Sequence, residues 1–461
     1  MLTLSFDGGT LLLEGDDPSE LDDLLDLPGV KYDERVRAIR APAIRYYEIF
    51  AALYRRQKRG ELTFTDEARA YDELELELAQ YREPYPHQGE ALEAWLKSGR
   101  RGLVVLPTGA GKSYIAELAI WKAKRSALVV APTIDLMNQW YDLLTTSFQR
   151  PVGIVGGGYH DVEDLTVTTY DSSYIHMERL GNRFGLIIFD EAHHLPGPTY
   201  AQAAEMALAP WRLGLTATPE RPDGQHALLD ILIGPCVYRK RIKELAGQYL
   251  AEYTTVPVHV PLSEEDAEEY HQERKIYKDF TWSQGIRMGS RHGWSDFLKK
   301  ASSSREGRRA FRAYRRQRQI ALAHSGKIQK VEDLLRRHAR DRVIVFTNDN
   351  DTVYEISRRF LLPCITHKTP TRERKLILER FNAGTYPCLV TSKVLNEGVN
   401  VPEANIAIVL SGSGTVREHV QRLGRILRRQ PDKHATLYEL ITSDTVEQYV
   451  SNRRRDHDAY R

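Results

Sequence analysis

The stretch GLVVLPTGAGKS, residues 102–113, decides the fold of this chain. Its first half, GLVVLP (102–107), is a short apolar run of strand length, and the glycines that follow it end the strand pattern. A helix is expected next, at about residues 112–123. A buried strand, a glycine turn and a helix in this order predict the first strand–helix unit of a parallel sheet.

The same alternation of strands and helices recurs along the chain. Strands are expected at SALVVAP (126–132), LTVTTY (165–170), GLIIFDEAHH (185–194) and RLGLTATP (212–219). A second set is expected at RVIVFT (342–347), PCITHK (363–368), PCLVTS (387–392), NIAIVLSG (405–412) and ATLYELI (435–441). Val/Ile/Leu strands separated by helices are typical of parallel sheets covered on both faces. The chain is therefore predicted to be α/β, with two units of similar design.

This pattern divides the chain into five segments. Residues 1–75, with short alternating apolar runs and a helical stretch at about 41–58, predict a small separate α+β domain. Residues 80–240 and 326–445 hold the two strand–helix units. The charged and mostly helical segment 241–325 is the expected linker and basic insertion, and residues 446–461 form a basic tail.

The glycine turn after the first strand has the composition of a phosphate-binding loop. Backbone N–H groups can solvate the crowded oxygens of a triphosphate only where the loop comes close to them. Gly109 and Gly111 allow this close approach because they have no side chains. Lys112 is expected to reach the β- and γ-phosphates, and Ser113 offers a hydroxyl to Mg²⁺. The predicted ATP-binding residues are Gln88, Pro107, Thr108, Gly109, Ala110, Gly111, Lys112 and Ser113.

The acidic end of GLIIFDEAHH predicts a second part of the same site. Asp190 ends a buried strand, where its carboxylate can hold the water shell of Mg²⁺, and Glu191 is placed to polarise an attacking water. The pair follows the phosphate loop by about 80 residues and precedes Thr216 and Thr218 by about 25. His193, Thr216 and Thr218 are predicted to couple ATP chemistry to the rest of the molecule.

The second unit carries QRLGRILR, from Gln421 to Arg428. Arg425 and Arg428 lie one helical turn apart and so share a helix face. Planar guanidinium groups suit the spread charge of a γ-phosphoryl transition state, which makes these arginines candidate arginine fingers. Gln421, Arg425 and Arg428 are therefore predicted to be catalytic together with Lys112 and Glu191, once the two units close on the nucleotide.

Charge is unevenly distributed, although the formal net charge is only +2. The segment 16–26 is acidic, and residues 287–318 hold eleven cations against Asp296 and Glu306. The aromatic residues in or beside this basic segment are Trp282, Trp294, Phe297, Phe311 and Tyr314. A solvated helix face and a surface that contacts phosphates and bases account for this composition equally well.

The sequence also argues against several classes of protein. Its apolar runs are shorter than the 18 or so residues of a membrane-spanning helix, and MLTLSFDGGT lacks the regions of a secretory signal. Three scattered cysteines, Cys236, Cys364 and Cys388, provide neither a disulfide framework nor a four-cysteine iron–sulfur site. We expect no membrane partner, no iron–sulfur cluster, and a cytoplasmic location, associated with the nucleoid if the cell is prokaryotic.

Together these motifs resemble those of superfamily 2 helicases, which have two tandem RecA-like domains. The motifs are Gln88, the phosphate loop, APT (131–133), TTYD (168–171), DEAH, TAT, VFT (345–347), TSKVLNEGVNVPEAN (391–405) and QRxGRxxR. The chain resembles most the xeroderma pigmentosum group B (XPB) helicases of the compact archaeal type. FGLIIFDEAHHLPGPTY, WRLGLTATPERPDG and NEGVNVPEANIAIVLSGSGTVREHVQRLGRILR carry this resemblance, which covers about residues 80–445 and more weakly the first 75.

The resemblance implies an ATP-dependent 3′–5′ DNA helicase of nucleotide excision repair, acting at junctions of single strand and duplex, with a partner endonuclease. It implies that residues 1–75 form a damage-recognition-like domain and that about 265–320 form a thumb-like module that grips DNA. Glu397 and Gly398 fall in a motif that couples ATP to movement. The positions implied to contact DNA are Thr133, Thr169, Arg221, Asp223, Thr347 and Thr391.

The chain departs from the family pattern at three places. In the coupling motif, Asn396 and Asn400 stand where the family often has aspartate. The Arg-Glu-Asp loop of the family appears as Arg221-Pro222-Asp223, and the entry of the adenine pocket appears as Tyr85-Pro86-His87-Gln88, with Tyr81 or Tyr85 as the stacking partner. Two other functions stay open beside the helicase. One is a double-stranded DNA translocase or remodelling ATPase that works with a partner nuclease and unwinds weakly, and the other is an RNA helicase of the DEAH type.

Overall fold

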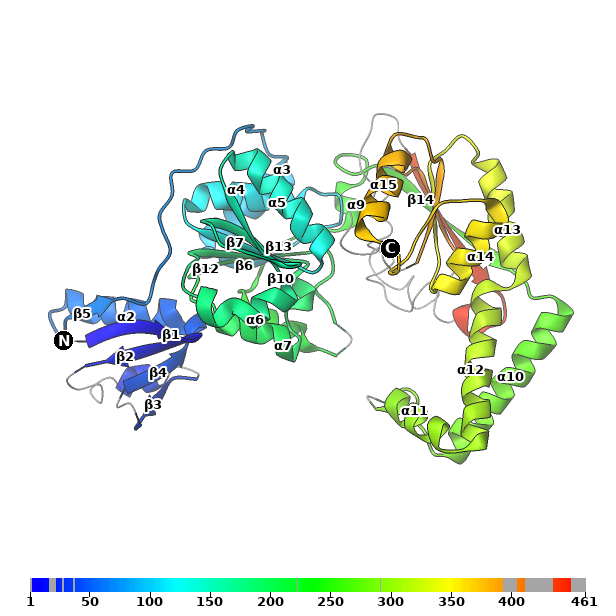
Figure 1. Cartoon of the computed structure of the whole chain (residues 1–461), viewed down its shortest axis with the longest axis horizontal. Helices are drawn as coiled ribbons and strands as arrows, with labels where there is room; N and C mark the ends of the chain where they lie inside the picture. The colour runs from blue at the N-terminus through cyan, green and yellow to red at the C-terminus, as the bar shows by residue number, and fades with distance from the viewer. Residues whose placement is uncertain are drawn as a thin grey trace. The chain divides into compact units, whose positions relative to one another are not determined.

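The computed structural model describes residues 2–15, 22–26, 29–35, 38–221, 223–290, 292–392, 404–410 and 434–448 (Figure 1). These residues form two compact units. Those as far as Leu245 belong to the first unit, and those from Ala246 onwards belong to the second. None of the helices in these ranges has the length and hydropathy of a membrane-spanning segment.

The first unit begins with a five-stranded sheet in the order β3-β4-β2-β1-β5. β1 and β5 are parallel, and the other neighbours are antiparallel. Leu2 and Leu4 in β1, and Leu11 and Leu13 in β2, alternate with more exposed residues, so one face of the sheet is buried. The elements are β1 (Leu2–Asp7), β2 (Thr10–Glu14), α1 (Asp22–Leu25), β3 (Lys31–Asp33), β4 (Ala38–Pro42), α2 (Tyr46–Lys58) and β5 (Phe64–Asp66).

An eight-stranded sheet forms the rest of the first unit, in the order β13-β6-β12-β11-β7-β10-β8-β9. Only β8 and β9 are antiparallel neighbours, so the predicted parallel sheet is confirmed. Figure 1 shows α3, α4 and α5 on one side of this sheet and α6 and α7 on the other. The elements are α3 (Pro86–Lys97), β6 (Arg101–Val105), α4 (Lys112–Ala123), β7 (Ala127–Ala131), α5 (Ile134–Phe148), β8 (Val152–Gly156), β9 (Tyr159–Asp161), β10 (Leu165–Thr169), α6 (Tyr170–Leu180), β11 (Leu186–Asp190), α7 (Pro198–Glu205), β12 (Trp211–Thr216), α8 (Leu229–Leu232), β13 (Cys236–Arg239) and α9 (Ile242–Leu245).

The strand order of this sheet brings three loops side by side. β12 lies between β6 and β11, and all three strands run in parallel. Because parallel strands end at the same edge of a sheet, the loops that follow them meet at that edge. These loops carry the glycine turn, the DEAH sequence and the TAT sequence, so the topology gathers the motifs that the sequence singled out.

The small N-terminal sheet and the eight-stranded sheet share apolar contacts. Leu208, just before β12, is 1% exposed and belongs to the core of the N-terminal sheet. Ile44, just before α2, belongs in turn to the core of the larger sheet. Asn182 Nδ2 donates to Ala68 O over 2.9 Å, and Ala70 N donates to Asn182 O over the same distance. The first unit is therefore one continuously packed body.

The second unit contains a six-stranded parallel sheet in the order β14-β19-β18-β15-β17-β16. Strands β15 to β19 fall where the sequence predicted them, but β14 lies in the segment expected to be linker and helical insertion. The segment was expected to be charged and mostly helical, whereas β14 is an edge strand, which tolerates Pro257 because one of its sides is unpaired. The elements are β14 (Glu252–Val260), α13 (Ser325–Arg337), β15 (Val343–Phe346), α14 (Asn350–Phe360), β16 (Cys364–Ile365), α15 (Thr371–Asn382), β17 (Cys388–Thr391), β18 (Ile406–Val409) and β19 (His434–Thr442).

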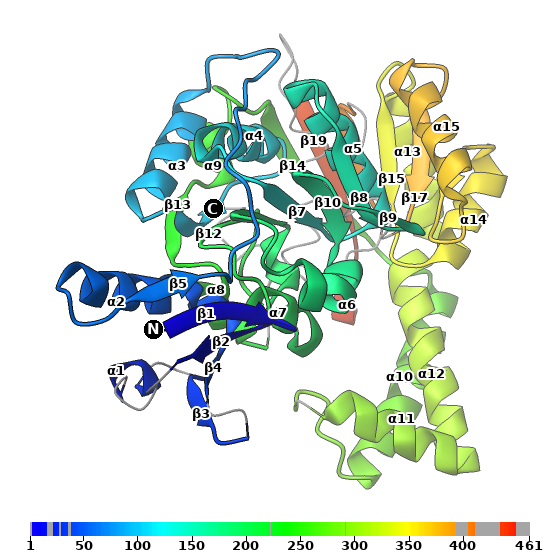
Figure 2. The same ribbon diagram turned by 60° about the vertical axis from the view of Figure 1, so that its left-hand side comes forward.

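Three helices form an insertion between β14 and α13. α10 (Glu264–Ser283) and α12 (Arg305–Ala323) lie side by side, and α11 (Gly293–Ser303) lies across the end of the pair that is far from the sheet (Figure 2). Phe297 is fully buried at the centre of a small core in this insertion, whereas Trp282 and Trp294 are 87% and 42% exposed. The expectation of base contact therefore does not extend to Phe297, because its ring packs inside the protein.

Candidate active site

The glycine turn after β6 leads directly into α4. Gly109 and Gly111 have φ angles of 89° and 79°, in the left-handed region that residues with side chains rarely adopt. Lys112 is the first residue of α4, and its Nζ donates to the carbonyls of Leu106 (3.1 Å) and Pro107 (3.3 Å). The ammonium group thus lies over the turn, where phosphate oxygens can replace these two carbonyl oxygens as its partners.

Gln88 packs against the glycine turn. Its Nε2 donates to the carbonyls of Ala110 (3.2 Å) and Gly111 (3.4 Å), and its Oε1 accepts from Tyr85 N over 2.9 Å. A Cβ at Gly111 would lie only 2.2 Å from Gln88 Nε2, so this contact is a second reason for glycine here. His87 Nε2, which sequence reasoning missed, also lies 2.9 Å from Ala110 O. Gln88 supports the loop, and its role in reading adenine stays a prediction.

Asp190 ends β11 in a nearly closed environment. Trp140 Nε1 donates to its Oδ2 over 2.9 Å, and Glu191 N donates to its Oδ1 over 3.0 Å. Burial, followed by the Glu191 carboxylate, raises the pKa of Asp190 to about 6, while the Trp140 N–H and the Lys112 ammonium act in the opposite direction. Trp140 was not predicted, although a buried indole N–H on an apolar helix face needs an acceptor and could have indicated such a contact.

Glu191 and His193 lie in the turn that follows β11. Glu191 has a φ angle of 46°, a left-handed conformation that is costly for a residue with a side chain and that concentrates at functional sites. His193 is fully buried, and its Nδ1 lies 3.1 Å from Thr216 Oγ1 and 3.4 Å from Glu191 Oε2. Thr216 Oγ1 also accepts from Thr218 N over 3.3 Å. The structure thus brings together His193, Thr216 and Thr218, the three described residues that were predicted to couple ATP chemistry to the rest of the molecule.

Arg221 ties a further segment to this turn. Its Nε and Nη2 donate to the two carboxylate oxygens of Asp223, over 3.0 and 2.6 Å, and its Nη1 donates to His193 O over 3.0 Å. The Arg221 side chain, through these hydrogen bonds, holds the pKa of the Asp223 carboxyl well below its usual range. Sequence reasoning assigned Arg221 and Asp223 to DNA contact and missed the bond to the DEAH turn, which no short-range pattern reveals.

The four threonines predicted to contact DNA have two kinds of surroundings. Thr133 and Thr169 are the N-cap residues of α5 and α6, and their hydroxyls accept backbone N–H groups of those helices. Thr347 and Thr391 are fully buried, and their hydroxyls donate to backbone carbonyls. Side-chain contact with DNA at the second pair would require local rearrangement, whereas the first pair lies at two helix N-termini, which favour anions.

Several predicted residues lie outside the part of the chain that the structure describes: Glu397, Gly398, Gln421, Arg425 and Arg428. Their roles in coupling and in phosphoryl transfer stay predictions. Pro222, the middle residue of the Arg-x-Asp loop, lies outside it as well.

The described residues of the first unit fit a triphosphate with a divalent cation. The phosphate loop offers backbone N–H groups and the Lys112 ammonium, Ser113 offers an exposed hydroxyl in the first turn of α4, and Asp190 offers a carboxylate. Within the described ranges, no group of three or more His, Cys, Asp or Glu side chains could hold a metal ion by itself. Mg²⁺ suits this donor set because it keeps several waters and takes phosphate oxygens as ligands.

Three family profiles match the chain. Residues 4–68 match the xeroderma pigmentosum group B helicase damage recognition domain, residues 82–221 the type III restriction enzyme, res subunit, and residues 308–458 the ERCC3/RAD25/XPB C-terminal helicase. Among solved structures, the chain is similar to the crystal structure of the Pyrococcus furiosus Hef helicase domain, with a TM-score of 0.50 and 20% identity over 80% of this chain and 98% of that one. This likeness supports the fold, two RecA-like parallel-sheet domains.

Relatives match over most of the chain. A Sulfurisphaera tokodaii protein named DNA 3′-5′ translocase XPB2 is 42% identical over 93% of this chain and 96% of its own length. A Mycobacterium tuberculosis protein named DNA 3′-5′ helicase XPB is 30% identical over 78% of this chain, which spans 61% of that protein. A Saccharomyces cerevisiae protein named general transcription and DNA repair factor IIH helicase/translocase subunit XPB/SSL2 is 27% identical over 86% of this chain and 46% of its own length. The chain therefore belongs to the xeroderma pigmentosum group B (XPB) helicase family.

Proposed function

We propose that the chain is a DNA-dependent ATPase that moves 3′ to 5′ along DNA and separates its strands, in nucleotide excision repair. The observation that carries this proposal is that the phosphate loop, Asp190 and the His193–Thr216 contact lie at the ends of three neighbouring parallel strands, along one sheet edge. The names of the relatives support DNA as the substrate and the 3′–5′ direction. The match of residues 4–68 to a damage recognition domain supports the role in repair.

Several residues at this edge of the eight-stranded sheet are proposed to take part in ATP hydrolysis, each with its own role. Lys112 and the N–H groups of the loop bind the β- and γ-phosphates. Ser113 and Asp190 would hold Mg²⁺, which supplies positive charge to the phosphate oxygens. Glu191 accepts a proton from water as the water oxygen bonds to the γ-phosphorus and the bond from that phosphorus to the β–γ bridging oxygen breaks. The residues proposed to stabilise the transferred phosphoryl group are Gln421, Arg425 and Arg428.

Two contacts of the DEAH turn are proposed to transmit the state of the nucleotide. The His193–Thr216 hydrogen bond reaches the end of β12, and the bond from Arg221 to the His193 carbonyl reaches the next loop. Thr133 and Thr169 place two helix N-termini at the same sheet edge, where DNA phosphates are proposed to bind. Phosphate contacts carry no sequence information, which suits a motor that moves over any sequence.

A second candidate function is a double-stranded DNA translocase that unwinds weakly. The Sulfurisphaera tokodaii relative, named a translocase, favours this candidate. Duplexes with a 3′ or a 5′ tail distinguish the two functions when strand displacement and ATP hydrolysis are measured together. A helicase displaces the strand from the 3′-tailed duplex, whereas a translocase hydrolyses ATP on blunt duplex and displaces a third strand from a triplex without opening the duplex.

The same measurement of ATP hydrolysis is made with RNA of the same length and sequence as the DNA. We expect DNA to stimulate ATP hydrolysis and RNA to leave it at the basal rate. Stimulation by RNA alone would instead support the RNA helicase. A partner endonuclease and a cytoplasmic or nucleoid location are proposed on the resemblance alone, and co-purification from the native source tests both.

A further inference from the structure

Two groups of arginines on α12 differ in their surroundings. Arg309 and Arg316 face α10 and form 2.6 Å ion pairs with glutamates of that helix. Arg305, Arg308 and Arg312, here called the rim arginines, are exposed and form no ion pair with any described residue. Their spacing of three and four residues places them on one face of the helix. Pairing between helices therefore explains the first group and leaves the rim arginines unexplained.

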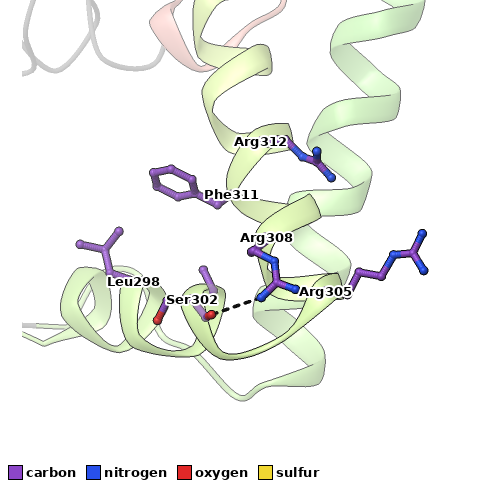
Figure 3. Close-up of a pocket in the computed structure, with 7 residues that line it drawn as sticks. Leu298, Ser302, Arg305, Arg308, Phe311 and Arg312 are labelled. Carbon is purple, nitrogen blue, oxygen red and sulfur yellow. Dashed lines mark hydrogen bonds between the residues drawn. The ribbon is translucent and has the colours of Figure 1, made fainter.

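The rim arginines border a cavity of about 490 Å³ between α11 and α12. Its apolar wall is formed by Leu298, Ala301 and Phe311. Figure 3 shows Leu298 and Phe311 projecting to the same side of the corner between the helices, with Arg308 reaching the carbonyl of Ser302 over 3.5 Å. In the same view the guanidinium groups of Arg305 and Arg312 extend away from the Phe311 ring (Figure 3).

The corner between α11 and α12 is fixed by close packing. A Cβ at Gly307 would lie 2.7 Å from Ala301 Cα, so the two helices can approach this closely only because Gly307 has no side chain. Ser304 caps α12, and its Oγ accepts from Gly307 N over 2.8 Å. The positive end of this 19-residue helix lies beside the rim arginines, which strengthens the attraction for negative charge. The cavity is therefore a built feature of the insertion.

A ligand that has a flat apolar ring and negative charges beside the ring suits this surface. Phe311 offers an aromatic face and Leu298 an apolar contact, as in proteins that stack the bases of single strands. The rim arginines line the same cavity and offer charges and hydrogen-bond donors that suit phosphates. The volume lies within the range of about 300–1,000 Å³ typical of small-molecule pockets. Nucleobases with flanking phosphates combine these properties in one ligand.

A neighbouring cavity differs from the first in the charges of its lining. It has about 920 Å³, shares Phe311 and Arg312 with the first cavity, and runs along α12 to the start of α14. Its lining carries four arginines of α12 and Arg358, together with Asp349, Asp351 and Glu355, whose carboxylates repel phosphates. The first cavity, by contrast, has three arginines and no carboxylate among the described residues that line it.

We propose that the cavity between α11 and α12 holds one unpaired base of a DNA single strand, with the flanking phosphates on the rim arginines. Bases inside a duplex are stacked on both faces and cannot enter, so the insertion detects strand opening. This inference rests on the proposed function in one respect, because it takes DNA as the substrate.

Binding of the full-length protein to three oligonucleotides of equal length tests the proposal: oligo(dT), the same backbone without bases, and a blunt duplex. Phe311→Leu keeps an apolar side chain but removes the aromatic face, and we expect it to weaken oligo(dT) binding roughly tenfold and abasic binding by less than about twofold. Leu298→Trp is at a 40% exposed position and fills the cavity, so it tests the same point if Phe311→Leu does not fold. Duplex binding is expected to stay unchanged in both variants.

The rim arginines have a matched control on the same helix. The double variant Arg308→Gln/Arg312→Gln is expected to weaken binding of oligo(dT) and abasic strand alike, and to reduce the salt slope by roughly 0.7 for each phosphate that is no longer neutralised. Arg309→Gln/Arg316→Gln makes the same change in net charge on the α10 side and is expected to change binding by less than about threefold. Equal weakening of binding in the two double variants would overturn the proposal.

Other outcomes also decide against the cavity. If Phe311→Leu and Leu298→Trp bind oligo(dT) as the unmodified protein does, or lose abasic binding equally, no base enters the cavity. If polyglutamate displaces oligo(dT) in the unmodified protein but not in the rim-arginine variant, an acidic protein segment is the occupant. DNA-stimulated ATP hydrolysis is measured in parallel, and its absence from the unmodified protein would instead remove the proposed function.

Discussion

His193 Nδ1 lies 3.1 Å from Thr216 Oγ1, and this contact joins the turn after β11 to the end of β12. Both side chains are fully buried, so the contact is shielded from water. Glu191 Oε2 lies 3.4 Å from the same ring nitrogen of His193. The histidine therefore lies between the residue proposed to activate water and the strand end that leads to the Arg221 loop.

The first prediction concerns this contact. Thr216→Val removes the hydroxyl at nearly constant volume. We expect it to retain DNA-stimulated ATP hydrolysis within about twofold while strand displacement falls roughly fivefold, since one buried hydrogen bond is worth about 1 kcal/mol. Thr216→Ser is the control and should restore displacement. ATP consumed per base pair opened is the measured ratio, and a parallel fall of both activities would argue for a purely structural contact.

The second prediction concerns the nucleotide site. Lys112→Ala and Glu191→Gln should each lower ATP turnover by roughly 10²-fold or more, because each removes a group proposed to act on the γ-phosphate. DNA binding measured without nucleotide should stay within about twofold. Lys122→Ala, on the same helix as Lys112 but in its last turn, is the control. Normal turnover in either site variant would refute the assignment.

The third prediction separates coupling from DNA contact at Arg221. Arg221→Ala removes the hydrogen bond to the His193 carbonyl, and we expect ATP turnover to fall roughly tenfold with little change in the salt slope of DNA binding. Arg239→Ala removes an arginine of similar charge that forms an exposed pair with Glu220, and it should leave turnover unchanged. A changed salt slope with normal turnover would assign Arg221 to DNA instead.

The fourth prediction concerns stability against pH in the second unit. Burial, followed by the Lys327 ammonium, lowers the pKa of His324 to about 4. Between about pH 6.5 and 4 the unfolded chain binds more protons here than the folded chain does, so stability is lost as the pH falls through this window, by up to about 3 kcal/mol. His324→Asn should flatten the decline in thermal midpoint from pH 7.5 to 5, whereas His271→Asn, at an exposed site, should leave it unchanged.

The fifth prediction tests whether the N-terminal sheet braces the first unit. Leu208→Ala should lower the free energy of unfolding by about 2–5 kcal/mol, because Leu208 is buried in the core of that sheet. Leu228→Ala, at a 39% exposed position of the same unit, should change it by less than about 0.5 kcal/mol. Denaturant unfolding measures both. If Leu208→Ala has no effect, the N-terminal sheet and the larger sheet do not stabilise each other.

Local patterns were enough for the strands and helices around the motifs. The helix predicted at about 112–123 is α4 from Lys112 to Ala123, because the glycine turn before it and the helix itself are specified by adjacent residues. β14 shows where such patterns fail. Its nine residues pair with β19, which lies far along the chain, and the segment around it is charged and mostly helical. The burial of Thr347 and Thr391 could not be predicted either. A threonine at a strand end has the same neighbours in the sequence whether its hydroxyl is exposed or buried.

By itself the sequence determined the α/β architecture, the phosphate loop, the acidic strand end and the family, since each depends on residues that are close in the chain. Only the tertiary structure decided which distant side chains meet: Trp140 with Asp190, Arg221 with the His193 carbonyl, and two arginines of α12 with glutamates of α10. These contacts depend on the direction in which helices and loops pack on the sheets. Packing of that kind is set by the whole core, so no short stretch of sequence can encode it.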